Sequence, residues 1–168
     1  MDVGVEFNSL SKTYNLTGAR ISFVLGNREM VSAIRTFRSQ IDYGIFRPIQ
    51  KAAVAALTGP EDSVGRIRSQ YRERSRALAE GLSSVGWPVK PSKATMFLWT
   101  RLPKGYTDSA KFAVELLDKA GVICVPGSNF GQLGEGFVRF ALVQPPEEMR
   151  RLAKIIGESG IIKEPVYE

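Results

Sequence analysis

Hydrophobic and polar residues alternate in two short stretches near the start of the chain, and the pattern then changes to a helical period. Residues 3–7 and 19–26 are rich in β-branched and apolar side chains and predict two strands, whereas the polar stretch 8–18 between them predicts a loop. After Asn27, a residue type suited to capping a helix, apolar side chains recur at helical spacing. A helix is therefore expected over residues 27–40.

The rest of the chain continues with helical and strand patterns separated by glycine and proline. Helices are expected over residues 48–59, 63–86, 109–121 and 145–160, and strands over residues 95–100, 122–127 and 136–143. The apolar side chains expected to form the core include Phe97, Trp99, Phe112, Leu116, Leu117, Val125, Phe140, Leu152 and Ile156. This pattern predicts a mixed α/β fold in which helices cover a small sheet.

The two strands predicted at the start of the chain have no evident sheet neighbours. A lone pair of strands cannot bury both of its faces. The sequence is therefore expected to be the C-terminal portion of a larger protein.

Composition narrows the possible chemistry. The 168 residues include one cysteine and no histidine, which excludes an internal disulfide, a multi-cysteine zinc site and catalysis that depends on histidine. The formal net charge of +6 favours anionic ligands without choosing among them. The sequence has neither an apolar run near the length of a membrane helix nor a secretory signal pattern, so we expect a cytoplasmic protein without membrane contact.

The most reactive residue types in the polar stretch surround Lys12. Ser9 and Ser11 precede this lysine closely, and Arg20 follows it. Alone, such a lysine is most often a solvated surface residue. However, lysine also forms Schiff bases with aldehydes, and hydroxyls beside an arginine suit a phosphate group.

Residues 9–20 closely resemble the cofactor-lysine segment of class I and II pyridoxal-phosphate aminotransferases. That segment has a small residue, an apolar residue, a small residue and lysine, followed by arginine eight positions later. This sequence carries the pattern as Ser9, Leu10, Ser11, Lys12, Gly18 and Arg20. Ser22 departs from it, because the family usually has glycine or alanine there.

The resemblance extends over nearly the whole chain. Residues 39–57 resemble the helix that joins the two domains of the family, residues 93–103 resemble a strand of its small domain, and residues 121–143 resemble the loop and strand that carry the substrate-carboxylate arginine. The similarity is greatest to the branch of LL-diaminopimelate and aspartate aminotransferases. It implies a fold-type-I protein, with residues 1–59 from the large domain and interdomain helix and residues 60–168 as the C-terminal small domain.

The resemblance also implies roles for individual residues. Lys12 would bind the aldehyde of pyridoxal 5'-phosphate and move a proton during catalysis. Ser9 and Arg20, with less support for Ser11, would hold the cofactor phosphate. Arg139 would bind the α-carboxylate of the substrate, although its place between two apolar residues on a strand would by itself indicate an outward-facing surface arginine.

Other implications concern substrates and assembly. The substrates would be an amino acid and a 2-oxo acid, and the protein would be a homodimer. In the family, the acidic partner of the cofactor ring lies N-terminal to the cofactor lysine, so the 168-residue chain is expected to be inactive alone. Weaker candidates are Met96 and Phe97 in the substrate pocket, Gly127, Phe130 and Gly131 in a loop over the site, and Asp42 and Tyr43 near a neighbouring subunit.

Three alternatives compete with this interpretation. Ser9 and Lys12 also fit the S-x-x-K pattern of β-lactamases, but the companion motifs are absent from the sequence. The arginines of the long predicted helix suit a nucleic-acid interface, although their alternation with Glu73 and Glu80 indicates a solvated face. The chain could also be a non-catalytic fragment. We expect no nucleic-acid partner.

Overall fold

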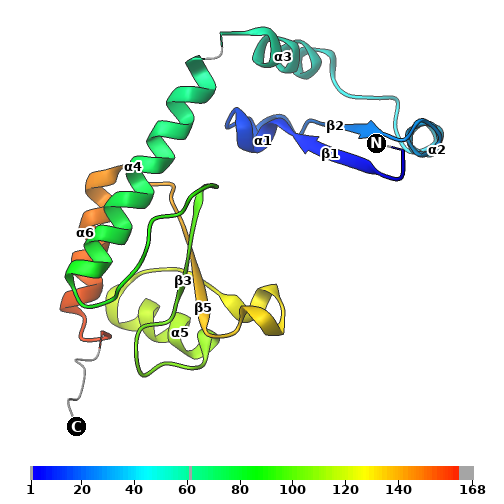
Figure 1. Cartoon of the computed structure of the whole chain (residues 1–168). Coiled ribbons are helices and arrows are strands. Elements are labelled where there is room, and N and C mark those ends of the chain that lie inside the picture. Colours follow the sequence, from blue (N-terminus) through cyan, green and yellow to red (C-terminus); the bar gives the residue numbers. More distant parts are fainter. Residues whose placement is uncertain (1, 61, 163–168) are drawn as a thin grey trace. The chain divides into compact units, whose positions relative to one another are not determined.

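The computed structural model describes residues 2–60 and 62–162, and the chain divides into two compact units, Met1–Arg68 and Ser69–Glu168. The division falls inside the long helix α4 (Asp62–Ser84) (Figure 1). The structure is mixed α/β, as the sequence predicts.

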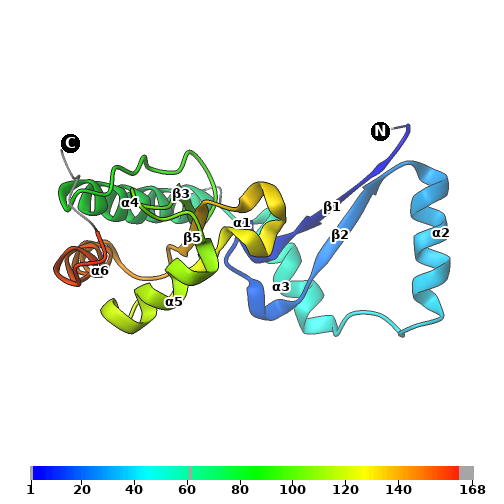
Figure 2. The same ribbon diagram turned by 90° about the horizontal axis from the view of Figure 1, so that it is seen from below.

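A β-hairpin begins the first unit. Strand β1 (Val5–Ser9) pairs antiparallel with β2 (Ser22–Gly26), in a register that places Ser9 opposite Ser22. The two strands lie side by side in both views (Figure 1 and Figure 2). Both predicted strands are confirmed, although β1 begins and ends two residues later than expected and β2 begins three residues later.

The connection between these strands is more ordered than the predicted polar loop. It contains the short helix α1 (Leu10–Thr13) and the 3-10 turn η1 (Thr17–Ala19). Leu10 is buried to 2% exposure. One buried apolar side chain in a polar stretch leaves little periodic signal, so the sequence pattern did not predict this helix.

Two predicted helices complete the first unit. Helix α2 (Arg28–Ser39) begins after Asn27, whose side-chain carbonyl accepts a hydrogen bond from the Met30 N–H at 3.0 Å. Helix α3 (Arg47–Thr58) has Pro48 in its first turn, where the missing proline N–H costs no helical hydrogen bond.

An antiparallel sheet of three strands lies in the second unit, in the order β3-β5-β4. The strands are β3 (Phe97–Arg101), β4 (Val125–Pro126) and β5 (Phe137–Ala141). Strand β4 is shorter than the predicted 122–127, because residues 122–124 form no strand and a 3-10 turn begins at Gly127. The inner face of the sheet carries the buried Leu98, Thr100, Val138 and Phe140.

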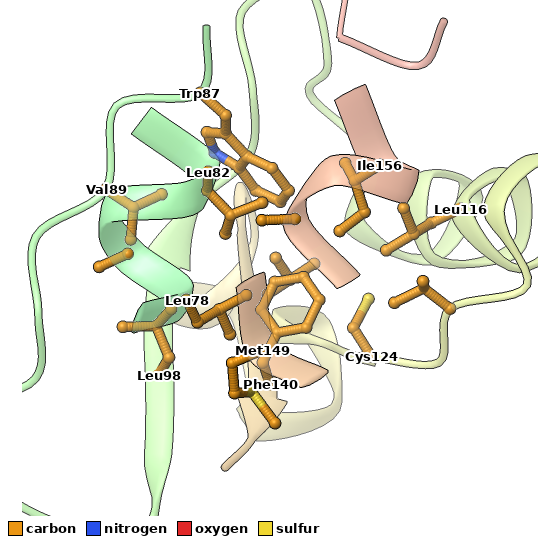
Figure 3. Close-up of a cluster of buried hydrophobic side chains, with 14 of the residues drawn as sticks. Leu78, Leu82, Trp87, Val89, Leu98, Leu116, Cys124, Phe140, Met149 and Ile156 are labelled. Atoms are coloured by element: carbon orange, nitrogen blue, oxygen red, sulfur yellow. The ribbon is translucent and has the colours of Figure 1, made fainter. Parts of the chain in front are cut away.

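Three helices contribute further core side chains: α4, α5 (Ser109–Ala120) and α6 (Pro146–Glu158). Figure 3 shows Leu78 and Leu82 of α4, Leu116 of α5, and Met149 and Ile156 of α6 among the core side chains. The Trp87 ring meets Phe112 and Phe140 edge to face, with centroids 5.5 Å and 5.9 Å apart. Its indole N–H donates to the Arg101 carbonyl at 2.9 Å, which satisfies the one polar group that this ring brings into the core.

Cys124 also lies in this core (Figure 3). Its exposed fraction is 8%. Burial raises the pKa of its thiol to about 11. The thiol is therefore protonated and shielded near neutral pH.

Two side chains predicted to point inward are exposed, and those two predictions were wrong. Leu117 is 47% exposed, because Phe112 and Leu116 occupy the inward face of α5 and the next position is rotated by about 100°. Trp99 is 41% exposed, because it alternates on β3 with the buried Leu98 and Thr100 and so lies on the outer face of the sheet.

Helices α4 and α6 approach closely where their facing side chains are small. A Cβ added to Gly81 would lie 2.7 Å from the Ala153 Cβ. At Gly65 of the same helix, apart from its chain neighbours and the nearby helix backbone, no atom of the described residues lies within 4 Å of that position. Glycine is therefore required by packing at residue 81 but not at residue 65.

Candidate cofactor and substrate site

The hydroxyl of Ser9 is fixed where the hairpin strands end. Ser9 is the N-cap of α1, and its Oγ accepts a hydrogen bond from the Ser11 N–H at 3.2 Å. The same Oγ lies 3.5 Å from the Ile21 carbonyl, to which it donates. This serine therefore ties the start of the connection to its end.

The backbone around Lys12 is folded back on itself. The Thr17 hydroxyl donates to the Ser11 carbonyl at 3.2 Å, and the Tyr14 N–H donates to the Leu10 carbonyl at 3.1 Å. Ser11 is buried, with 7% exposure, and Lys12 is exposed on α1. An exposed lysine is therefore carried on a backbone segment that hydrogen bonds hold in place.

Arg20 stands at the end of η1 in a left-handed backbone conformation, with φ 50° and ψ 45°. This conformation costs a non-glycine residue about 1–3 kcal/mol and is found preferentially at functional sites. The Arg20 Nη1 donates to the Thr17 carbonyl at 3.2 Å, and the side chain is exposed. Thr17 thus contacts both the segment before Lys12 and the arginine after it.

Four of the five predicted site residues lie on one connection, residues 9–20. This segment offers hydroxyl, ammonium and guanidinium donors and contains no carboxylate. Such a donor set fits the phosphate of pyridoxal phosphate, and a lysine amine is a group that can react with an aldehyde. Arg139, the fifth predicted residue, lies in the second unit.

Arg139 lies on the outer face of the sheet, opposite Trp99 in the register of β3 and β5. Its guanidinium carbon is 4.2 Å from the centroid of the Phe97 ring and 4.7 Å from that of the Phe130 ring. Its Nε is buried and has no hydrogen-bond partner among the described residues. A buried donor of this kind suits an oxygen ligand.

The loop that carries Phe130 is built from two 3-10 turns, η2 (Gly127–Phe130) and η3 (Gln132–Gly134). Gly127 and Gly134 are so close that a Cβ on either would collide with the carbonyl of the other. The Ser109 N–H donates to the Glu135 carboxylate at 2.7 Å, and the Ser128 N–H donates to the Ser109 Oγ at 3.2 Å. These contacts anchor the loop to the start of α5.

The two rings in contact with Arg139 were not assigned to that arginine by the sequence prediction, which placed Phe97 in a pocket and Phe130 in a loop. Phe97 is on the strand paired with β5, and Phe130 precedes β5 in the chain. The available signal was the alternation of Phe97, Trp99 and Arg101 on one strand, which marks an outer face rich in aromatic and cationic groups.

Asp42 and Tyr43, the weaker candidates in the first unit, lie after α2. The Arg38 Nε donates to the Asp42 Oδ2 at 2.7 Å, and the Gly44 N–H donates to its Oδ1 at 2.9 Å. These hydrogen bonds lower the pKa of Asp42. Tyr43 is fully exposed.

Similarity to known proteins covers both units. The model of the family "Aminotransferase class I and II" matches residues 2–156. LL-diaminopimelate aminotransferase of Moorella thermoacetica is 43% identical over 161 residues, which cover 94% of this chain and 41% of that protein. The corresponding enzyme of Aquifex aeolicus is 43% identical over 155 residues, 92% of this chain and 40% of that protein.

Solved structures give the same result. Substrate-bound BacF from Bacillus subtilis matches with a TM-score of 0.89 and 32% identity, over 93% of this chain and 40% of that one. A probable N-succinyldiaminopimelate aminotransferase from Thermus thermophilus matches with a TM-score of 0.83 and 41% identity, over 92% of this chain and 41% of that one.

These matches define an α/β chain of the fold-type-I class of pyridoxal-phosphate-dependent transferases. The chain belongs to the class I and II aminotransferase family. It spans about 40% of the length of the curated relatives that it matches. Within residues 2–60 and 62–162, no helix combines the length and the hydrophobicity needed to cross a membrane.

Proposed function

We propose that this chain supplies the cofactor-binding lysine and the carboxylate-binding arginine of an aminotransferase that moves an amino group from an amino acid to a 2-oxo acid. The observation that carries the proposal is the connection 9–20, where Ser9, Ser11, Lys12 and Arg20 are held on one hydrogen-bonded segment. The family match over residues 2–156 supports it.

Pyridoxal phosphate, when bound, supplies an aldehyde carbon and a ring that withdraws electrons from the substrate. Lys12 would hold the cofactor covalently through Nζ and, once released, would move a proton at Nζ from the substrate α-carbon. Lys12 is an exposed residue of α1, which suits a role that requires contact with cofactor and substrate. No histidine is present in the chain to do this work.

Ser9 and Arg20 would hold the cofactor phosphate. The Ser9 Oγ is already oriented by the Ser11 N–H and the Ile21 carbonyl, and the Arg20 guanidinium keeps donors beyond the one that contacts Thr17. Ser11 would contribute from its buried position, with its backbone fixed by Thr17.

Arg139 would bind the substrate carboxylate. A planar guanidinium matches two carboxylate oxygens better than an ammonium does. Its buried and unpaired Nε supports this role, because a carboxylate oxygen would complete its hydrogen bonding.

The same proposal covers domains and assembly. Residues 1–59 would belong to the large domain and interdomain helix, and residues 60–168 would form the small domain. The complete enzyme would be a cytoplasmic homodimer. LL-diaminopimelate is the first substrate to test, because relatives that are 43% identical carry its name.

A chimera tests this proposal. This chain would replace the matched segment of the Moorella thermoacetica enzyme, and the product would be loaded with pyridoxal phosphate and reduced with borohydride. We expect mass spectrometry to find the phosphopyridoxyl group on Lys12, with turnover of LL-diaminopimelate and a 2-oxo acid. Lys12→Ala should lose the label and at least about 10³-fold of the activity, whereas Lys51→Ala, on the exposed surface of α3, should retain both.

Labelling of another lysine, or turnover by the Lys12→Ala chimera, would contradict the proposal. The 168-residue chain alone should show no turnover with added pyridoxal phosphate, because the acidic partner of the cofactor ring is expected outside it. Turnover by this chain that depends on Lys12 would show that residues 1–168 complete the catalytic site without further protein.

A further inference from the structure

The outer face of the second unit's sheet is a continuous array of aromatic rings and guanidinium groups. Trp99 stacks on Phe137 with centroids 5.5 Å apart and meets Phe130 edge to face at 5.4 Å. Arg101 lies over Phe137, and Arg139 lies over Phe97 and Phe130. The face therefore carries two arginines in different ring environments.

Those environments differ in number of rings and in burial. The guanidinium carbon of Arg101 is 5.0 Å from one ring, and the residue is exposed. That of Arg139 is within 4.7 Å of two ring centroids, and its Nε is buried without a partner among the described residues. Contact with two rings should therefore restrict the motion of the Arg139 guanidinium more than contact with one ring restricts the motion of Arg101.

We infer that Phe97 and Phe130 are positioning residues for carboxylate recognition by Arg139, an inference that rests on the proposed role of that arginine. All N–H donors of a guanidinium lie in its plane. Rings over the guanidinium leave the in-plane edge as the place where a ligand forms hydrogen bonds. A carboxylate binds along that edge through both oxygens.

The contact also lowers the cost of binding. An arginine side chain has many rotamers, and ordering them on association weakens affinity. The two rings order the guanidinium during folding, before the ligand arrives. An unpaired buried Nε–H is unfavourable in the free protein, and the incoming oxygen removes that penalty.

Phe130 can act in this way because its loop is itself anchored. The collision that a Cβ would cause between Gly127 and Gly134 shows how closely the two turns pack. Ser109 is fully buried and is bonded to both Ser128 and Glu135, so the two ends of the loop are tied to one residue of α5. The ring is thus held over Arg139 by backbone and buried polar contacts, although half of Phe130 is exposed.

The test is a titration of the 168-residue chain with sodium acetate, followed through the arginine Nε–Hε resonances by NMR, with sodium chloride at equal ionic strength as reference. We expect the Arg139 resonance to shift with acetate in a saturable manner and the Arg101 resonance to follow ionic strength only. Phe130→Leu keeps apolar bulk but removes the ring face, and it should weaken acetate binding about twofold to thirtyfold.

Two variants distinguish a positioning role of the Phe130 ring from a general effect on the structure of this face. Phe130→Tyr restores a ring and should bind acetate within about twofold of the parent chain. Phe137→Leu removes the ring under Arg101 on the same face and should leave binding at Arg139 unchanged. The Trp87 indole N–H resonance reports whether each variant keeps the core intact.

Unchanged affinity in Phe130→Leu, or an Arg139 resonance that does not respond to acetate in the parent chain, would overturn the inference. Failure of the Lys12 label in the chimera would instead overturn the proposed function. The two results are distinguishable, because the titration uses no cofactor and the label does not depend on Arg139.

Discussion

The connection 9–20 and the outer face of the sheet hold their cationic groups in different ways. In the connection, hydrogen bonds between residues close in sequence fix the backbone, and the Lys12 and Arg20 side chains remain exposed. On the sheet, aromatic rings from separate segments hold Arg139. Hydrogen bonds within residues 9–20 order the backbone and leave the charged side chains exposed. On the sheet, ring contacts order the Arg139 guanidinium itself before a ligand binds.

Substitution of Arg139, the arginine held by rings, should give the largest change in activity. In the chimera, Arg139→Ala should lower kcat/KM for the amino acid by about 100-fold or more, because a bidentate charged contact is lost. Cofactor occupancy, measured by absorbance, should stay near that of the parent. Arg101→Ala, on the same face, is the control and should change kcat/KM by less than about twofold. Loss of cofactor with normal substrate affinity would reverse the assignment.

Arg20 tests the locally built site. Arg20→Ala in the chimera should weaken pyridoxal phosphate about 10- to 100-fold, as expected for a lost charge-assisted contact, with a smaller change in substrate KM. Arg47→Ala, at the exposed start of α3, serves as the control in a cofactor titration followed by absorbance. Equal cofactor affinity in Arg20→Ala and the parent would remove this residue from the phosphate site.

Two glycines of α4 distinguish tight packing from open surface. Gly81→Ala should destabilise the 168-residue chain by about 1–3 kcal/mol, because the new methyl group meets Ala153. Gly65→Ala should stabilise it by up to about 1 kcal/mol, because alanine favours helix and the space there is open. Urea unfolding followed by circular dichroism compares them, and the packing argument fails if both variants shift in the same direction.

The smallest effect concerns the loop that carries Phe130. The N–H groups of Gly136 and Ser109 lower the pKa of Glu135, so its ionised form contributes stability above the pKa of the unfolded chain. That contribution is lost as pH falls through the lower folded-state pKa. Glu135→Gln should therefore be less stable than the parent at pH 7, with a difference that shrinks toward the acid range. A difference independent of pH, measured by urea unfolding, would contradict this origin.

Local signals made most of the fold predictable, and four candidate site residues come from the same short-range pattern, although their roles stay predictions. Asn27 as a cap, Pro48 in the first turn of α3, and the spacing of Ser9, Lys12 and Arg20 are all visible within a few residues. Helix α1 was missed because a single buried leucine, Leu10, carries no periodicity.

Features that depend on distant residues were harder to predict. The direction of Leu117 depends on which face of α5 meets the sheet, and the exposure of Trp99 depends on which side of β3 the helices cover. The Phe97 and Phe130 contacts with Arg139 require the register of two strands and the fold of a loop. The family resemblance pointed to Arg139 without these contacts.

The single cysteine, Cys124, is buried in the second unit, so its reaction with a thiol reagent reports local unfolding of that unit. Cys124 is shielded in the core, and its raised thiol pKa suppresses the reactive thiolate. An alkylating reagent can modify this position only when the surrounding structure opens. The rate of thiol modification therefore counts openings of this unit alone, without a signal from the hairpin and its connection, which contain no sulfhydryl group.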